Sequence, residues 1–87
     1  MKVVMLYRPN SENSRLVEEY AKNLERQYHT KINMVSLDTR DGASTASLYD
    51  IVQNPAILVL GNDGQIVQQW QGTTLPLMAE ISYYTHQ

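Results

Sequence analysis

The chain alternates between short apolar runs and longer stretches in which apolar residues recur at intervals. Residues 3–7, VVMLY, are apolar without alternation, which is typical of a strand covered on both faces and therefore central in its sheet. Over residues 14–28, apolar positions recur every three or four residues between charged ones, which predicts an amphipathic helix. The apolar positions of this helix are Leu16, Val17, Tyr20, Ala21, Leu24 and Tyr28.

Beyond this helix, the pattern predicts three more strands and a second helix. The strands are expected at residues 31–37, 56–60 and 65–71, and the helix, which is weaker, at about 44–51. The tetrapeptide GNDG at 61–64 supplies residues that tolerate the positive φ of a tight turn. The last two strands are therefore predicted to form a hairpin.

A final helix is predicted after Gly72. A threonine cap at Thr73 or Thr74, with Pro76 in the first turn, indicates its start. The residues expected to face inward are Leu77, Met78, Ile81 and Tyr84. The element order is then β-α-β-α-β-β-α, and a right-handed crossover makes the first two strands parallel neighbours.

Length and composition indicate one globular domain over residues 1–87, with 43% hydrophobic and 18% charged residues. No apolar run approaches the about 20 residues of a membrane-spanning helix, and residues 3–7 are too short for a signal-peptide core. We therefore expect a cytoplasmic protein without a membrane partner. The net charge of −2, with scattered Lys and Arg, gives no reason to expect a nucleic-acid partner.

Cysteine is absent from the chain. Its absence excludes disulfide bonds, thiolate metal sites and any mechanism that needs a sulfur nucleophile from this chain. The absence of cysteine is informative because the rest of the sequence resembles a family that uses cysteine.

Two stretches together resemble the thioredoxin superfamily over nearly the whole chain. Residues 7–28, YRPNSENSRLVEEYAKNLERQY, are similar to its active-site loop and first core helix. Residues 35–72 are similar to the rest of its core through Pro55, Gly64 and Gly72. The compact outline is more similar to a glutaredoxin than to a full-length thioredoxin.

The resemblance implies an α/β fold, a thioredoxin-like three-layer α/β/α sandwich around a four-stranded mixed sheet of order 2-1-3-4. It also implies that the bond before Pro55 is cis and that this proline faces the loop that holds Ser11 and Ser14. Asn54 would then offer free backbone groups to an extended peptide, which would bind by strand addition. The alternative is an ordinary trans proline at the start of an edge strand.

The same resemblance shows that the redox residues of the family are replaced. The two cysteines of the redox families fall at Ser11 and Ser14, and a serine hydroxyl neither ionises near neutral pH nor forms a disulfide. The buried carboxylate of thioredoxins falls at Met5, and its lysine partner falls at Ser36. The glycine pair with which glutaredoxins recognise glutathione is also replaced, since residues 72–75 read GTTL. We therefore predict no dithiol chemistry and no cofactor.

A hydrolytic role for Ser11 or Ser14 would need a neighbouring base, usually histidine. His29 follows the first helix, roughly 20 Å or more from Ser14 at about 1.5 Å per residue, and His86 ends a helix that runs away from this loop. We therefore interpret the serines as helix-capping residues. The two histidines could meet at the opposite end of the molecule, but they lack a third ligand, so we predict no metal site.

Arg8 and Arg15 bracket the start of the first predicted helix, where free amides and the helix dipole favour an anion. A carboxylate or a phosphate could bind there. The alternative is that both arginines are solvated or paired with carboxylates of this chain, for which the candidates are Asp38, Asp41 and Glu12.

Three classes of function remain open. The favoured one is a non-redox binding module without enzymatic activity, which holds an extended segment of a protein or peptide partner. Its predicted site consists of Ser11, Glu12, Asn13, Ser14, Asn54 and Pro55. The second is a small-molecule or anion-binding protein that uses Arg8 and Arg15. The third is an enzyme whose partner supplies the missing thiol or base. The oligomeric state is left open.

Overall fold

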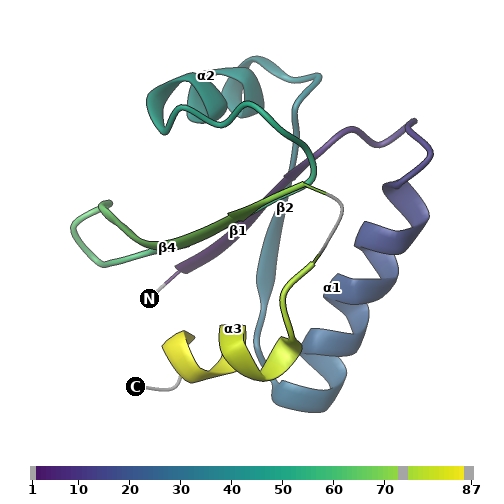
Figure 1. The fold of residues 1–87 in the computed structure, drawn as a ribbon, viewed down its shortest axis with the longest axis vertical. Coiled ribbons are helices and arrows are strands. Elements are labelled where there is room, and N and C mark those ends of the chain that lie inside the picture. The colour runs from purple at the N-terminus through teal and green to yellow at the C-terminus, as the bar shows by residue number, and fades with distance from the viewer. Residues whose placement is uncertain (1, 73–74, 86–87) are drawn as a thin grey trace.

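A computed structural model describes residues 2–72 and 75–85 of the chain (Figure 1). The elements follow one another in the order predicted from the sequence, which is therefore confirmed. They are β1 (Lys2–Tyr7), α1 (Ser14–Tyr28), β2 (Ile32–Ser36), α2 (Arg40–Leu48), β3 (Ala56–Leu60), β4 (Ile66–Gln71) and α3 (Met78–Thr85). None of these helices is long and apolar enough to cross a bilayer within the described ranges.

The four strands form one mixed sheet in the order β2-β1-β3-β4, as predicted. β1 lies parallel to β2 and antiparallel to β3, and β3 and β4 form an antiparallel hairpin. Gly64, at a φ of 83°, occupies the left-handed position that the hairpin turn requires. All five residues of β3 are buried, which explains why this strand reads as an uninterrupted apolar run.

Apolar residues on the two faces of the sheet form two separate core clusters. One contains Val3, Met5 and Ile57 of the sheet with residues of α1 and α3, while the other contains Val4, Leu6 and Leu58 with residues from α2 and its flanks. In Figure 1, α2 accordingly lies on one side of the sheet and α3 on the other. The predicted three-layer α/β/α sandwich is confirmed.

Helix α1 has the bounds that the apolar spacing predicts, but the serines do not cap it. Asn13 occupies the N-cap position without a side-chain hydrogen bond to the helix. Ser11 instead donates from its hydroxyl to the carbonyl oxygen of Arg8, at 2.8 Å, and Ser14 is already the first helical residue. The prediction of a serine cap is therefore wrong, because the turn before the helix uses the Ser11 hydroxyl locally.

Helix α2 begins four residues earlier than predicted and ends at Leu48. The Thr39 hydroxyl caps it by accepting a hydrogen bond from the backbone N–H of Gly42, at 3.0 Å. Gly42 belongs to the helix because a β-carbon there would lie 1.9 Å from the carbonyl oxygen of Ser36, so only glycine allows this close approach to the end of β2. Asp41 and Gly42 therefore lie in the first turn of this helix.

Helix α3 begins after Pro76 and Leu77, not around them. Leu77 is 71% exposed, so the prediction that it faces inward is wrong, whereas Ile81 is fully buried and Met78 and Tyr84 pack against the same cluster. The carbonyl oxygen of Pro76 accepts a hydrogen bond from the Tyr20 hydroxyl, at 2.7 Å, which fixes the approach to α3 against α1. The proposed cap at Thr73 or Thr74 lies outside the described residues.

Candidate functional site

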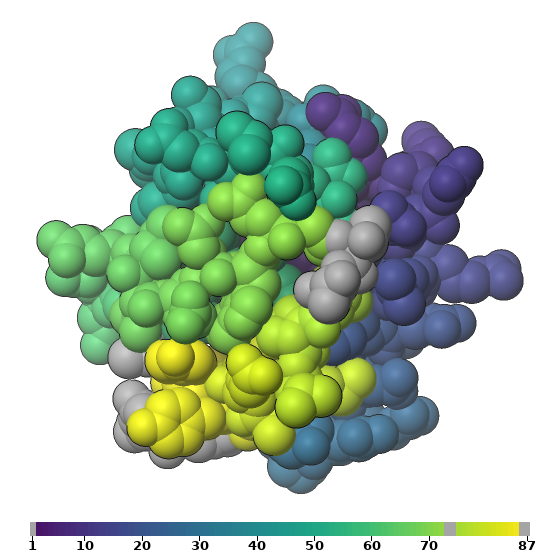
Figure 2. Space-filling view, viewed as in Figure 1, coloured from purple at the N-terminus to yellow at the C-terminus, as the bar shows by residue number. Residues whose placement is uncertain are grey.

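The end of β1 and the start of β3 meet at one edge of the sheet. Leu6 pairs with Ala56 in the antiparallel register, so the residues that follow β1 and those that precede β3 leave the sheet at the same level. Arg8 and Asn54 line one cavity there. At the upper right of Figure 2, atoms of the chain after β1 (purple) lie beside atoms of the segment before β3 (teal-green). We call this region the Asn54 end of the molecule.

The segment before β3 is held by the end of β4. The side-chain oxygen of Gln71 accepts hydrogen bonds from the backbone N–H groups of Val52 and Gln53, at 3.1 and 3.2 Å. The backbone N–H of Gly72 donates to the carbonyl oxygen of Pro55, at 2.9 Å. The Asn54–Pro55 peptide bond is cis, the isomer that the resemblance implies, and Pro55 is buried.

Asn54 is only partly buried, and its backbone is unpaired. Within residues 2–72 and 75–85, neither its N–H nor its carbonyl oxygen enters a hydrogen bond. An unpaired, accessible backbone donor and acceptor on one residue is the feature that an added strand can use.

The loop between β1 and α1 is a compact turn that faces its own backbone. The N–H of Ser11 donates to the carbonyl oxygen of Arg8, and the N–H of Ser14 donates to that of Ser11, both at 3.2 Å. Ser11, Asn13 and Ser14 are half-buried, and Glu12 is exposed. The structure describes all four predicted loop residues, but the cavity that includes Asn54 is lined by Arg8 from this stretch and not by them.

The two arginines of the predicted anion site are not brought together on one ligand position. A guanidinium nitrogen of Arg8 lies 2.8 Å from a carboxylate oxygen of Asp38, with both side chains about half exposed. Arg15 is exposed and enters no ion pair within the described ranges. The pairing of Arg8 is one of the alternatives that the sequence left open, and it neutralises the cation that the anion site would use first.

A cavity of about 230 Å³, which was not predicted, lies between this end of the sheet and α2. Arg8, Gln53 and Asn54 form its polar part. Its apolar lining consists of Leu37, Ala43, Ala46, Ile51 and Val52. Sequence reasoning missed the cavity because it placed the start of α2 after Ala43. A cap at Thr39 is the signal that would have put Ala43 and Ala46 on the inner side of the helix.

No family model matches the chain, and no curated protein matches it, but solved structures do. Thioredoxin 1 from Thermosipho africanus superposes with a TM-score of 0.69 at 8% identity, covering 99% of this chain and 91% of that one. Thioredoxin O2 from Arabidopsis thaliana gives a TM-score of 0.69 at 12% identity, covering 98% and 71%. A Plasmodium falciparum thioredoxin gives a TM-score of 0.65 at 12% identity, covering 98% of this chain and 82% of that one.

The chain has the thioredoxin fold. At these identities the likeness establishes the fold, and the chemistry has to be argued from this chain's own residues. Cysteine is absent from the sequence, so the dithiol exchange of redox-active thioredoxins cannot take place within this chain.

Met5 and Ser36 stand at the positions where the resemblance places a buried carboxylate and its lysine partner. Met5 is fully buried in the core cluster that faces α1 and α3. The Ser36 hydroxyl accepts a hydrogen bond from the backbone N–H of Asp38, at 3.0 Å, which is a structural role in the turn after β2. This thioredoxin fold therefore carries an apolar side chain where the resemblance places a buried carboxylate.

His29 does not stand near the loop serines. His29 follows the last residue of α1, with the whole helix between it and Ser14, and His86 lies outside the described residues. The proposed meeting of the two histidines therefore cannot be described. Within the described ranges, no group of three or more His, Cys, Asp or Glu side chains gathers in a way that could hold a metal ion.

Proposed function

We propose that this chain is a binding module of thioredoxin fold, which holds an extended protein or peptide segment at the Asn54 end without redox chemistry. The observation that carries the proposal is the unpaired backbone of Asn54 beside a cavity. In strand addition, backbone hydrogen bonds provide affinity, and pockets that receive alternate side chains provide specificity. The Asn54 end offers both components within a few residues.

The backbone of Asn54 supports the first component. One donor and one acceptor on the same residue can form two hydrogen bonds with a single residue of an antiparallel strand. The bonds from Gln71 to the N–H groups of Val52 and Gln53 hold the preceding segment in place, so the free groups of Asn54 are presented by a fixed backbone. Less ordering is then required when a partner binds.

The cavity of about 230 Å³ supports the second component. Side chains of an extended peptide point alternately to opposite sides, so a residue next to the one paired with Asn54 could enter the cavity. The lining is mostly aliphatic, which favours an apolar side chain. Val52, which is 85% exposed, adds apolar surface at the rim. We therefore expect the partner segment to carry an apolar residue at this position.

A selection of binders from a library of random linear peptides, followed by N-methylation of each backbone amide in turn, tests this proposal. Methylation removes the donor without changing the side chain. Strand addition at Asn54 predicts that methylation weakens binding at the one peptide position that pairs with Asn54 and is tolerated at the two positions beside it. In parallel, the NMR amide signal of Asn54 should shift on binding, with slower hydrogen exchange.

Two results would contradict the proposal. Peptides whose affinity is insensitive to backbone methylation would show that side chains alone are recognised. Shifts that spare Asn54 and the lining of the cavity would place the binding surface elsewhere.

The cytoplasmic location expected from the sequence stays a prediction, which imaging of the tagged protein in its native cell would test.

A further inference from the structure

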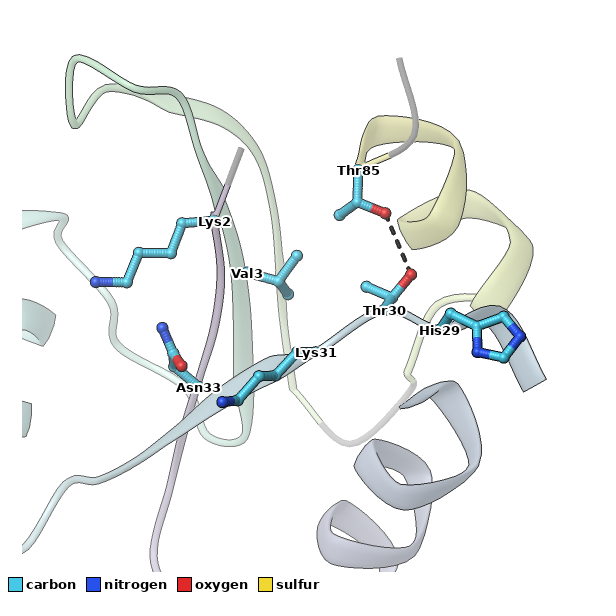
Figure 3. A pocket seen from close by; sticks show the side chains of 7 residues that line it. All are labelled: Lys2, Val3, His29, Thr30, Lys31, Asn33 and Thr85. Atoms are coloured by element: carbon cyan, nitrogen blue, oxygen red, sulfur yellow. Dashed lines mark hydrogen bonds between the residues drawn. The ribbon is translucent and has the colours of Figure 1, made fainter. Parts of the chain in front are cut away.

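A second cavity, of about 300 Å³, lies at the opposite end of the sheet (Figure 3). It is formed by the first residues of β1, the residues that lead into β2, and the last residue of α3. Lys2 and Lys31 stand five residues before Tyr7 and Ser36, the last residues of β1 and β2, which corresponds to about 16 Å along each strand. This cavity is therefore separate from the Asn54 end, and we call it the lysine end.

The strand register places three polar side chains of the lysine end on one face of the sheet. Val4 faces the α2 side, and Asn33 is its partner in the parallel pairing of β1 with β2. Lys2 and Lys31 each precede one of these two residues by two positions, so they point to the same side. In Figure 3 the side chains of Lys2, Lys31 and Asn33 extend from the two strands toward this side.

The electrostatics of the lysine end differ in sign from those of the chain as a whole. The protein carries a net charge of −2, yet none of the described residues that line this cavity has a carboxylate. Neither the Lys2 nor the Lys31 side chain enters an ion pair or hydrogen bond within residues 2–72 and 75–85. Two unpaired ammonium groups and an amide that can donate two hydrogen bonds thus surround one hollow.

We propose that the lysine end binds a small phosphate or phosphomonoester through Lys2, Lys31 and Asn33. A phosphoryl group offers three acceptor oxygens to donors that approach from different directions, whereas a carboxylate offers two oxygens in one plane. The volume of about 300 Å³ lies at the small end of the range for ligand cavities, which suits a compact anion.

Two other polar features of the lysine end are not part of the proposed site. The imidazole of His29 points away from the lysine side chains in Figure 3. The hydroxyl groups of Thr30 and Thr85 lie 3.3 Å apart, where they tie the end of α3 to the start of β2. This proposal does not depend on the function proposed for the Asn54 end.

The test is a titration of the uniformly labelled full chain with inorganic phosphate and with glycerol phosphate, followed by NMR amide shifts at constant ionic strength. We expect saturable shifts at Lys2, Lys31 and Asn33, with a dissociation constant on the order of 1 mM for solvent-exposed charges. Acetate at the same ionic strength should give no saturable shift. Saturation by acetate with equal affinity would overturn the assignment to a phosphoryl group, and shifts that remain linear would overturn the site.

The most informative variant is Asn33→Asp, which keeps the side-chain shape and places a carboxylate between the two lysines. It should abolish saturable phosphate binding, because the new charge repels the anion and pairs with the ammonium groups. Asn23 lies on α1, where its side chain accepts a hydrogen bond from Arg26. Asn23→Asp adds the same charge there and should leave phosphate binding unchanged. Equal losses in both variants would overturn the proposal, since net charge alone would then explain them.

A pair of milder variants measures the contribution of one ammonium group. Lys31→Gln should weaken phosphate binding about twofold to fivefold. Lys22→Gln removes the same charge from the exposed side of α1 and should have no effect. Unchanged affinity in Lys31→Gln would overturn the role assigned to this lysine.

Discussion

The two ends of the sheet show opposite arrangements of charge and apolar surface. At the Asn54 end, the nearest cation, Arg8, is paired with Asp38, and the cavity is lined mostly by aliphatic side chains. At the lysine end, among the residues that the structure describes, neither lysine side chain is paired and no carboxylate lines the cavity. The two ends of one fold thus carry different kinds of surface, on which the proposed peptide site and the proposed phosphate site respectively rest.

Substitution of Gly42 should have the largest effect on stability, and the change in structure should be confined to the Asn54 end. In Gly42→Ala the new β-carbon would meet the backbone oxygen of Ser36 at 1.9 Å, so α2 must move away from the sheet. We expect a loss of about 2 to 3 kcal/mol in the free energy of unfolding, measured by urea denaturation. Phosphate binding at the lysine end should persist in conditions where the variant is folded.

Gly64→Ala in the hairpin turn provides the control for this prediction. No atom lies within 4 Å of the new β-carbon there, and only the positive φ of 83° opposes the substitution. The expected loss is about 1 kcal/mol. Equal losses in Gly42→Ala and Gly64→Ala would show that the approach of α2 to β2 is looser than described.

Filling the cavity at the Asn54 end tests whether it receives a side chain of the partner. Ala43→Met should weaken peptide binding about tenfold, because the longer side chain occupies the volume that the partner would use. Ser44→Met adds a methionine at the next exposed position, which does not line the cavity, and should bind as the parent chain does. Isothermal titration with a selected peptide measures both. Equal affinity in the two variants would contradict the role of the cavity.

Helix α1 runs from one end of the molecule to the other, and Tyr20, near its middle, ties it to the segment that precedes α3. Tyr20→Phe removes the hydrogen bond to the Pro76 carbonyl oxygen, which should cost about 1 kcal/mol in urea denaturation. Tyr83→Phe, at a position that is 64% exposed, is the matched control and should cost little. A comparable loss in the control would contradict the structural role of Tyr20.

Tyr20 should also make the free energy of unfolding depend on pH. Burial, with a smaller contribution from the charge of Glu80, raises the pKa of Tyr20 to about 12, from about 10 in an unfolded chain. Because the folded pKa is higher, this contribution to stability is complete below pH of about 10 and is lost as the pH rises toward 12. In Tyr20→Phe the fall in stability over this window should be shallower. A slope identical to that of the parent chain would show that Tyr20 titrates normally.

The smallest expected effect concerns the ion pair at the Asn54 end. A double-mutant cycle of Arg8→Gln and Asp38→Asn should give a coupling of about 0.2 to 1 kcal/mol that shrinks at high salt, since both side chains are about half exposed. Lys31→Gln, at the end without an ion pair, should leave the free energy of unfolding within about 0.5 kcal/mol. A larger loss there would reveal a partner for Lys31.

Sequence reasoning worked where one physical signal acted alone. The spacing of Val17, Tyr20 and Leu24 gave the bounds of α1, and the unalternated run of β3 gave its burial on both faces. The sheet order followed from the crossover rule and from the resemblance to thioredoxins. These signals depend on local periodicity, which a single sequence contains in full.

Prediction failed where a residue's role is set by a neighbour distant in sequence. Gly42 resembles a turn residue until Ser36 is seen against it, and Leu77 fits the helical spacing although Pro76 is already engaged by Tyr20 before the helix begins. The lysine end was missed for the same reason, because only the parallel register brings Lys2 beside Lys31. Because α1 separates β1 from β2 in the sequence, no local stretch of residues contains this pairing.

The side chain of Gln71 has a consequence beyond its two hydrogen bonds. Its amide oxygen accepts hydrogen bonds from two consecutive backbone N–H groups, those of Val52 and Gln53, which lie outside the strands of the sheet. The conformation of the segment before Pro55 therefore depends on one side chain. Substitution of the Gln71 side chain would loosen this segment and leave the backbone pairing of the sheet in place.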